Sequence, residues 1–114
     1  MAYELIFFQS GAGRSPALDF LRSLPKPARA EAGWLLERLE KYGSSLDRPI
    51  VGYLEDGISE MRWQVDRNEY RLLFFFHGRH IIVVTHGFSK KTQKVPKGEI
   101  EKARKLRAEW LSRG

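Results

Sequence analysis

The hydrophobic pattern of the first 43 residues predicts one strand followed by two helices. Tyr3–Phe8 is a short run of aromatic and branched residues, which we interpret as an edge strand. Ser15 followed by Pro16 indicates the start of a short helix, which a second proline ends. A longer helix is predicted over residues 26–42, and Gly43 supplies its stop. Its apolar face recurs at three- and four-residue steps: Ala28, Ala32, Leu35, Leu36 and Leu39.

From Pro49 onward the pattern changes to short apolar runs separated by turn signals. Polar and glycine-containing turns, such as Asp56-Gly57, join these runs into sequential hairpins. The stretches 70–76 and 81–84 are almost uninterrupted, which indicates strands that are central in a sheet or covered on both faces. Pro96 opens a final helix. Four strands are predicted in this part, at residues 50–55, 58–65, 70–76 and 80–88. The apolar stripe of the final helix is Ile100, Ala103, Leu106 and Trp110.

This order of elements predicts an α+β fold. We expect one domain over residues 1–114, with an antiparallel sheet, an N-terminal helical hairpin and a basic C-terminal helix, and with the helices packed on one face of the sheet. The length, 42% hydrophobic and 30% charged residues fit a globular protein with its own core. The absence of cysteine excludes disulfides and thiolate metal sites. No apolar run approaches the roughly 18 residues of a membrane span, so we expect a cytoplasmic protein with no membrane partner.

The positive charge is concentrated at the C-terminal end. Residues 1–87 carry eleven Lys/Arg and eleven Asp/Glu, whereas residues 88–114 carry nine Lys/Arg and three Asp/Glu. The entire formal charge of +6 therefore lies in the last quarter of the chain. Such an asymmetry favours a polyanionic partner, and nucleic acid is the leading candidate.

Several familiar kinds of active site are not indicated. The three histidines, His77, His80 and His86, have no carboxylate at ligand spacing, so no metal site is predicted. The glycines at 11–13 lack the Lys-Ser/Thr of a phosphate-binding loop, and no Ser-His-Asp pattern is convincing. We therefore expect neither a metal nor a small-molecule cofactor.

Two arginines on predicted strands are candidates for chemistry. Arg62 lies in "SEMRW", and Arg71 lies immediately before an apolar run that must be buried, where a lone charge is costly. For Arg71, one interpretation is an ion pair with a neighbouring carboxylate or a cation resting on an aromatic ring. The other is a guanidinium at the rim of a phosphate-binding cleft. The carboxylates in question are Glu60, Asp66 and Glu69, and the rings are Trp63 and Tyr70.

A basic loop follows the last predicted strand. Gly87 breaks that strand, so the chain can turn and present Lys90 and Lys91. These lysines and the final helix are either a solvated surface or part of one positive surface that contacts RNA phosphates. Trp63, Tyr70 and Phe88 either stack on bases or lie in the core. The predicted RNA contacts are Phe88, Thr92, Gln93, Lys94, Lys97 and Arg104.

At this point the sequence resembles a known family. The elements "DG-I-SEMR", "EYRLLFFF", "HGFSKKTQK" and "P-GEIEKA", with the trailing basic helix, are similar to the HigB-like, phage-derived branch of the RelE/ParE toxin superfamily. The opening "GRSPALDFLRSLP" also matches, so the resemblance covers nearly the whole chain. It implies a RelE-like, microbial-RNase-like α+β fold. It also implies a toxin of a type II toxin-antitoxin module, with a cognate antitoxin as partner and mRNA on the ribosome as substrate.

The resemblance also implies roles for particular residues. Arg71 matches the Tyr-Arg element, Arg62 matches the Glu-Leu-Arg element, and Lys90 and Lys91 match basic positions after the last core strand. We expect the arginines to contact the phosphate and Lys90 or Lys91 to transfer protons, in an endoribonuclease that uses no metal. His86 is a reserve candidate for the base; its other interpretation is a satisfied strand-end histidine.

Two other functions remain open from the sequence. ParE-like members of the same superfamily bind DNA gyrase and have no nuclease site. A non-catalytic RNA-binding regulator with a degenerate site is a third interpretation. Cleaved mRNA, inhibited supercoiling, or neither would separate the three.

Overall fold

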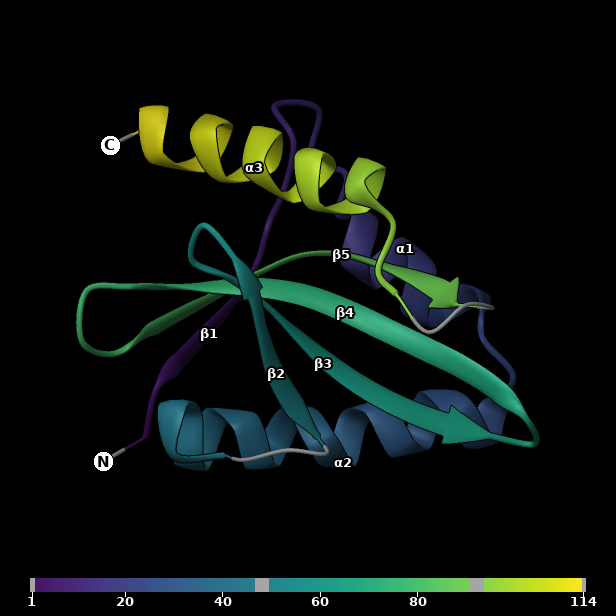
Figure 1. Cartoon of the computed structure of the whole chain (residues 1–114). Coiled ribbons are helices and arrows are strands. Elements are labelled where there is room, and N and C mark those ends of the chain that lie inside the picture. Colours follow the sequence, from purple (N-terminus) through teal and green to yellow (C-terminus); the bar gives the residue numbers. More distant parts are fainter. Residues whose placement is uncertain (1, 47–49, 91–93, 114) are drawn as a thin grey trace.

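The computed structural model describes residues 2–46, 50–90 and 94–113, and Figure 1 shows the arrangement of the helices and strands. A strand comes first, two helices follow, four strands form a meander, and a long helix comes last, as the sequence pattern predicts. A short 3₁₀ turn, Gly43–Ser45, follows the second helix. The elements are β1 (Glu4–Phe7), α1 (Pro16–Ser23), α2 (Lys26–Tyr42), β2 (Val51–Glu55), β3 (Ile58–Val65), β4 (Asn68–His77), β5 (Ile81–Lys90) and α3 (Lys97–Ser112).

The sheet is mixed, which corrects the prediction of an antiparallel sheet. Its strand order is β1-β5-β4-β3-β2. The meander from β2 to β5 is antiparallel, but β1 lies at the edge and runs parallel to β5. The physical reason is the long connection, because both N-terminal helices and three strands lie between β1 and β5 in the chain. Sequential hairpin signals describe neighbours in the chain, and they carry no information about such a distant pairing.

Helices cover both faces of the sheet, which corrects the prediction that they share one face. Helices α2 and α3 lie on opposite faces (Figure 1), and α1 shares the core of α2. Strand β4 shows the consequence, because its successive apolar side chains enter different cores. Leu72 and Phe74 belong to the core under α1 and α2, whereas Leu73 and Phe75 belong to the core under α3. The prediction that this apolar run is covered on both faces is confirmed.

The N-terminal helices form for the reasons visible in the sequence. The Ser15 hydroxyl accepts a hydrogen bond from the Leu18 amide at 3.3 Å, which caps α1, and Pro16 occupies its first position. Small residues let α2 approach the sheet closely, and the Trp63 indole donates to the Ala28 carbonyl at 3.1 Å. Within the described residues, no helix combines the length and apolar character needed to cross a membrane.

Gly43 ends α2 at a position that no other residue fits. Its backbone φ angle is +51°, in the left-handed region that residues with a Cβ rarely adopt. A Cβ placed there would lie 2.1 Å from the ring of Tyr3, just before β1. The glycine therefore allows the end of α2 to contact the start of β1.

We expect Gly43→Ala to lower the free energy of unfolding by about 2–3 kcal/mol, because it combines overpacking with an unfavourable backbone conformation. The matched control is Gly33→Ala in the middle of α2, where an added Cβ meets open space. That substitution is expected to raise stability by about 0.5–1 kcal/mol. Urea denaturation of the two variants and the unmodified chain measures both effects. Equal stability of the Gly43→Ala variant and the unmodified chain would contradict the close packing of Tyr3.

Candidate active site

A one-residue bulge in β5 determines which of its side chains reach the α3 face of the sheet. Leu73 pairs with His86, but the next residue, Phe74, pairs with Val84, so Thr85 is the extra residue. Leu73 packs in the core under α3, and cross-strand partners share a face. His86 therefore lies on the α3 face, and so do the side chains at two-residue steps beyond it.

Beyond the bulge, the strand register brings the predicted catalytic residues together. Phe88 pairs with Arg71, and Lys90 pairs with Glu69. On the other side of β4, Arg62 is directly opposite Arg71. Three neighbouring strands thus place two arginines and a lysine on the same face, near the end of β5. Three of the four residues predicted from sequence as catalytic lie in this cluster; the fourth, Lys91, is outside the described residues.

Arg71 is the most buried of these cations and has acceptors on several sides. The residue is 4% exposed. Its Nε lies 2.8 Å from Oε1 of Glu60, and its Nη2 donates to Oε1 of Glu69 at 3.0 Å. Its Nη1 donates to the carbonyl of Tyr70 at 3.1 Å. The structure therefore gives Arg71 the ion-paired environment that sequence alone left as one of two interpretations. It does not remove the other interpretation, because the guanidinium also borders a pocket.

Glu60 is a buried carboxylate between the two arginines. Its second oxygen, Oε2, lies 3.7 Å from Nη1 of Arg62. The contact between Glu60 Oε1 and Arg71 Nε is close, yet neither atom has a partner with hydrogen-bond geometry. Buried polar atoms without a hydrogen-bond partner are rare in folded proteins, so each one needs an explanation. The pair is thus held by charge attraction between two residues that are each 4% exposed.

The surroundings of Lys90 make its amine a weaker base than an ordinary lysine. Burial lowers the pKa of Lys90, because a charged ammonium loses its hydration there. The Arg71 guanidinium lowers that pKa further, whereas Glu60 and Glu69 oppose the change. A lysine with a lowered pKa exchanges protons more readily near neutral pH, which is the property required of a general acid or base.

A pocket of about 260 Å³ adjoins the two arginines. Its chemistry is mixed, with two cations, a carboxylate, an amide and apolar surface. The Trp63 indole also donates a hydrogen bond to α2, so its ring belongs mainly to the core. The buried Tyr70 belongs to the same core. The lining residues are Ile50, Arg62, Trp63, Gln64, Glu69 and Arg71. A phosphate group in this pocket would lie beside both guanidinium groups.

His86 connects the sheet to the first turn of α3. Its Nε2 lies 3.0 Å from Oε1 of Glu99, and its Nδ1 lies 3.2 Å from the hydroxyl of Thr85, which donates to the Leu73 carbonyl. Burial lowers the pKa of His86; the hydrogen bond to Glu99 opposes that change, and the charge of Lys102 adds to it. The ring is 1% exposed. These contacts match the interpretation of a satisfied strand-end histidine.

The predicted RNA contacts have different environments. Phe88 is half-buried beside the His86 ring, with the ring centres 6.0 Å apart. Lys94 and Lys97 are exposed near the start of α3. Thr92 and Gln93, like Lys91, lie outside the described residues.

Arg104 on α3 is engaged by carboxylates. It pairs with Glu55 at 2.8 Å, with Asp56 at 3.0 Å, and with Glu101 on its own helix. Arg107 pairs with the same Asp56 at 2.8 Å. The basic face of α3 thus attaches the helix to the turn between β2 and β3. Arg104 as an RNA contact stays a prediction, and RNA would have to compete with these carboxylates.

Sequence reasoning underestimated two features of the cluster. Glu60 appeared only as one of several possible partners, although its two-residue spacing from Arg62 on a strand already places both side chains on one face. The bulge at Thr85 had no signal at all, because Val, Thr and His are compatible with either register. Without the bulge, His86, Phe88 and Lys90 would face α1 and α2 instead.

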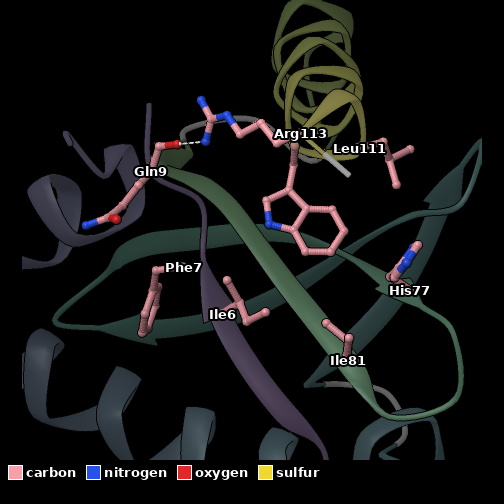
Figure 2. A pocket seen from close by; sticks show the side chains of 8 residues that line it. Ile6, Phe7, Gln9, His77, Ile81, Leu111 and Arg113 are labelled. Carbon is pink, nitrogen blue, oxygen red and sulfur yellow. Dashed lines mark hydrogen bonds between the residues drawn. The ribbon is translucent and has the colours of Figure 1, made fainter. Parts of the chain in front are cut away.

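A larger pocket lies elsewhere, and it contains none of the predicted site residues. It measures about 540 Å³ and lies between β1, the start of β5 and the last turns of α3 (Figure 2). Arg113 donates to the Gln9 carbonyl at its rim. The lining residues are Ile6, Phe7, Gln9, His77, Ile81, Trp110, Leu111 and Arg113. Within the described ranges, no group of three or more histidines and carboxylates could hold a metal ion.

Comparison with known proteins matches the sequence of this chain to an existing family. Residues 19–108 match the family described as "Phage derived protein Gp49-like (DUF891)". Two curated relatives, from Mycobacterium tuberculosis strains CDC 1551 / Oshkosh and ATCC 25618 / H37Rv, are each 36% identical over 107 residues. The alignments cover 91% of this chain and 82% of each relative, and both relatives are named "Probable endoribonuclease HigB1". The resemblance to phage-derived, HigB-like proteins inferred from sequence is confirmed.

Proposed function

The chain belongs to the phage-derived Gp49-like family, and from this membership we propose that it is an endoribonuclease that cleaves mRNA on the ribosome. In this proposal it acts as the toxin of a type II toxin-antitoxin module and inhibits translation. Support comes from the curated relatives, which are named probable endoribonucleases. The observation that carries the proposal is the convergence of Arg62, Arg71 and Lys90 on one face of the sheet.

The proposed reaction uses the RNA's own 2′-hydroxyl as nucleophile. That oxygen loses its proton and bonds to the adjacent phosphorus, and the bond from phosphorus to the 5′-oxygen breaks. The leaving 5′-oxygen takes up a proton, so the products are a 2′,3′-cyclic phosphate and a 5′-hydroxyl. Arg71 and Arg62 stabilise the negative charge of the five-coordinate phosphorus, and this electrostatic contribution is usually the largest one in such sites.

Lys90 or Lys91 is proposed to carry the protons. For Lys90 the support is its lowered pKa and its position opposite Glu69, next to Arg71. Lys91 is assigned from sequence alone. The proposed chemistry needs no metal ion, because the guanidinium groups supply the positive charge at the phosphate.

Dependence on the ribosome follows from the composition of the cluster. Its groups are mainly cations, which attract phosphate but do not by themselves fix the attacking oxygen in line with the leaving oxygen. Holding the RNA in that geometry contributes several kcal/mol to catalysis, of the order of 7–11 in favourable cases. We propose that the ribosome supplies this orientation.

An antitoxin is the proposed protein partner. The nine Lys/Arg of residues 88–114 outnumber the three Asp/Glu there, so an acidic segment would complement this end of the chain. Some of these cations are already paired within the chain, as Arg104 and Arg107 illustrate. An acidic antitoxin segment that contacts these arginines would therefore compete with Glu55 and Asp56.

The test is cleavage of a defined mRNA in a purified translation system. We expect new RNA 5′ ends, mapped by primer extension, when ribosomes, mRNA and the protein are all present, and none when ribosomes are left out. Supercoiling by DNA gyrase is measured beside it and is expected to be unchanged. Inhibited supercoiling with intact mRNA would replace the proposal with gyrase inhibition, and RNA binding without either effect would indicate a non-catalytic regulator.

A further inference from the structure

The Arg71 guanidinium is held by two carboxylates that differ in exposure. The side chain of Glu60 is 6% exposed, whereas that of Glu69 is 41% exposed. Glu60 contacts Nε, which faces the protein, and Glu69 accepts from Nη2. Both Glu69 and Arg71 line the pocket of about 260 Å³, whereas Glu60 does not. The carboxylate of Glu69 is thus the acceptor on the pocket side of the guanidinium.

We propose that Glu69 occupies the place of the RNA phosphate on Arg71 and is displaced when the phosphate binds. A carboxylate and a phosphodiester each carry one negative charge and present oxygens that accept from a guanidinium. The exchange therefore keeps the charge around Arg71 constant, while Glu60 stays in place and fixes the direction of the guanidinium. This inference rests on the proposed function, and it adds a residue that controls substrate binding.

The neighbouring groups favour this exchange over departure of Glu60. Removal of Glu60 would leave a buried charge without its partner, which is expensive, whereas Glu69 can turn into solvent. Lys90 lies directly opposite Glu69 across the strand pair, so a displaced carboxylate still has a cation beside it. The cost of release is accordingly small enough for a phosphate to supply.

The consequence is that Glu69 weakens RNA binding in the unmodified chain. Glu69→Gln keeps the shape of the side chain but removes the charge that competes with phosphate. We expect this variant to bind RNA about fivefold more tightly, because the phosphate no longer displaces a charged acceptor. A role for Glu69 in merely holding Arg71 predicts the opposite change.

A matched control separates this exchange from a general effect of charge. Asp66→Asn removes the same charge from the turn between β3 and β4, three residues away, at an exposed position with φ of +50° that asparagine tolerates. Its effect on RNA affinity is expected to be less than about twofold, since an exposed charge is screened by salt.

The experiment measures the affinity of the three proteins for a single-stranded RNA that carries 2′-O-methyl groups and is therefore not cleaved. The rate of mRNA cleavage on ribosomes at limiting protein concentration is measured beside it and is the deciding comparison where isolated RNA does not bind. A gain in RNA affinity, or in the cleavage rate where isolated RNA does not bind, that is seen in Glu69→Gln and not in Asp66→Asn supports the exchange. Equal gain in both variants, or a loss in Glu69→Gln, overturns it while leaving the endonuclease proposal intact if the unmodified chain cleaves. Absence of both binding and cleavage in all three proteins overturns the proposed function, and the inference with it.

Discussion

Replacement of Arg71 by alanine is expected to lower the rate of mRNA cleavage by about a hundredfold to a thousandfold. The reason is the position of its guanidinium, which is buried beside the pocket and is aimed by Glu60. Donors fixed in this way stabilise the charge of a transition state without having to reorganise, and loss of one costs two to three orders of magnitude, roughly. The measurement is the initial rate of appearance of cleaved ends in the purified translation system.

Loss of folding has to be separated from loss of chemistry in this variant, because alanine leaves Glu60 without its arginine. Arg71→Lys keeps the charge but gives up the fork of donors, so we expect a folded protein with an intermediate loss of rate. Arg79→Ala is the matched control, since Arg79 is an exposed arginine in the turn at the opposite end of β4. The cleavage rate of this variant is expected to stay within about twofold of the rate of the unmodified chain, because exposed charges are screened by salt.

Circular dichroism and thermal unfolding of all the variants accompany the rate measurements. A folded Arg71→Ala protein that cleaves at the full rate would remove Arg71 from the proposed mechanism. A comparable loss in Arg79→Ala would also contradict the assignment, because it would show that overall positive charge, and not the placed guanidinium, determines activity.

The sequence predicted the elements of this fold well because their signals are local. The Ser15-Pro16 start of α1 and the glycine stop of α2 depend on neighbours within one helical turn, and both were confirmed. The parallel pairing of β1 with β5 and the placement of α3 on the opposite face were missed. Both depend on contacts between residues far apart in the chain, which no local pattern encodes.

The same distinction applies to the candidate site. Arg71 is identified as a candidate from the sequence because a charged residue beside a long apolar run needs a partner or an open cleft, wherever the run lies in the fold. Its partners were narrowed to a few carboxylates, yet the sequence did not decide between ion pairing and an open cleft. The structure shows that both descriptions apply, since Arg71 is paired on one side and borders a pocket on the other. Which side chains join it was decided by the bulge at Thr85, a one-residue shift without a sequence signal.

Glu60→Leu is expected to lower the free energy of unfolding by about 3–5 kcal/mol, the cost of breaking a buried ion pair by removing one partner. Glu60 is buried, and its loss leaves Arg71 with a guanidinium nitrogen that has no counter-charge on the protein side. Glu69→Leu is the matched control, since it removes the other carboxylate of Arg71 from a position that is 41% exposed. It is expected to cost less than about 1 kcal/mol. Urea denaturation compares the two, and equal losses would contradict the division of roles between the carboxylates.

The double variant Glu60→Leu with Arg71→Met shows whether the buried pair serves stability or function. Replacing both members of a buried ion pair by apolar residues is often neutral or stabilising, so most of the stability lost in Glu60→Leu is expected to return. Cleavage is expected to stay as low as in Arg71→Ala, because the guanidinium is gone. The double variant would then be stable but inactive. That result would mean that the ion pair adds little net stability and that the chain maintains it in order to aim one arginine. If the double variant were less stable than Glu60→Leu alone, the pair would instead be a structural requirement of the sheet, and the case for a placed catalytic guanidinium would lose its energetic argument.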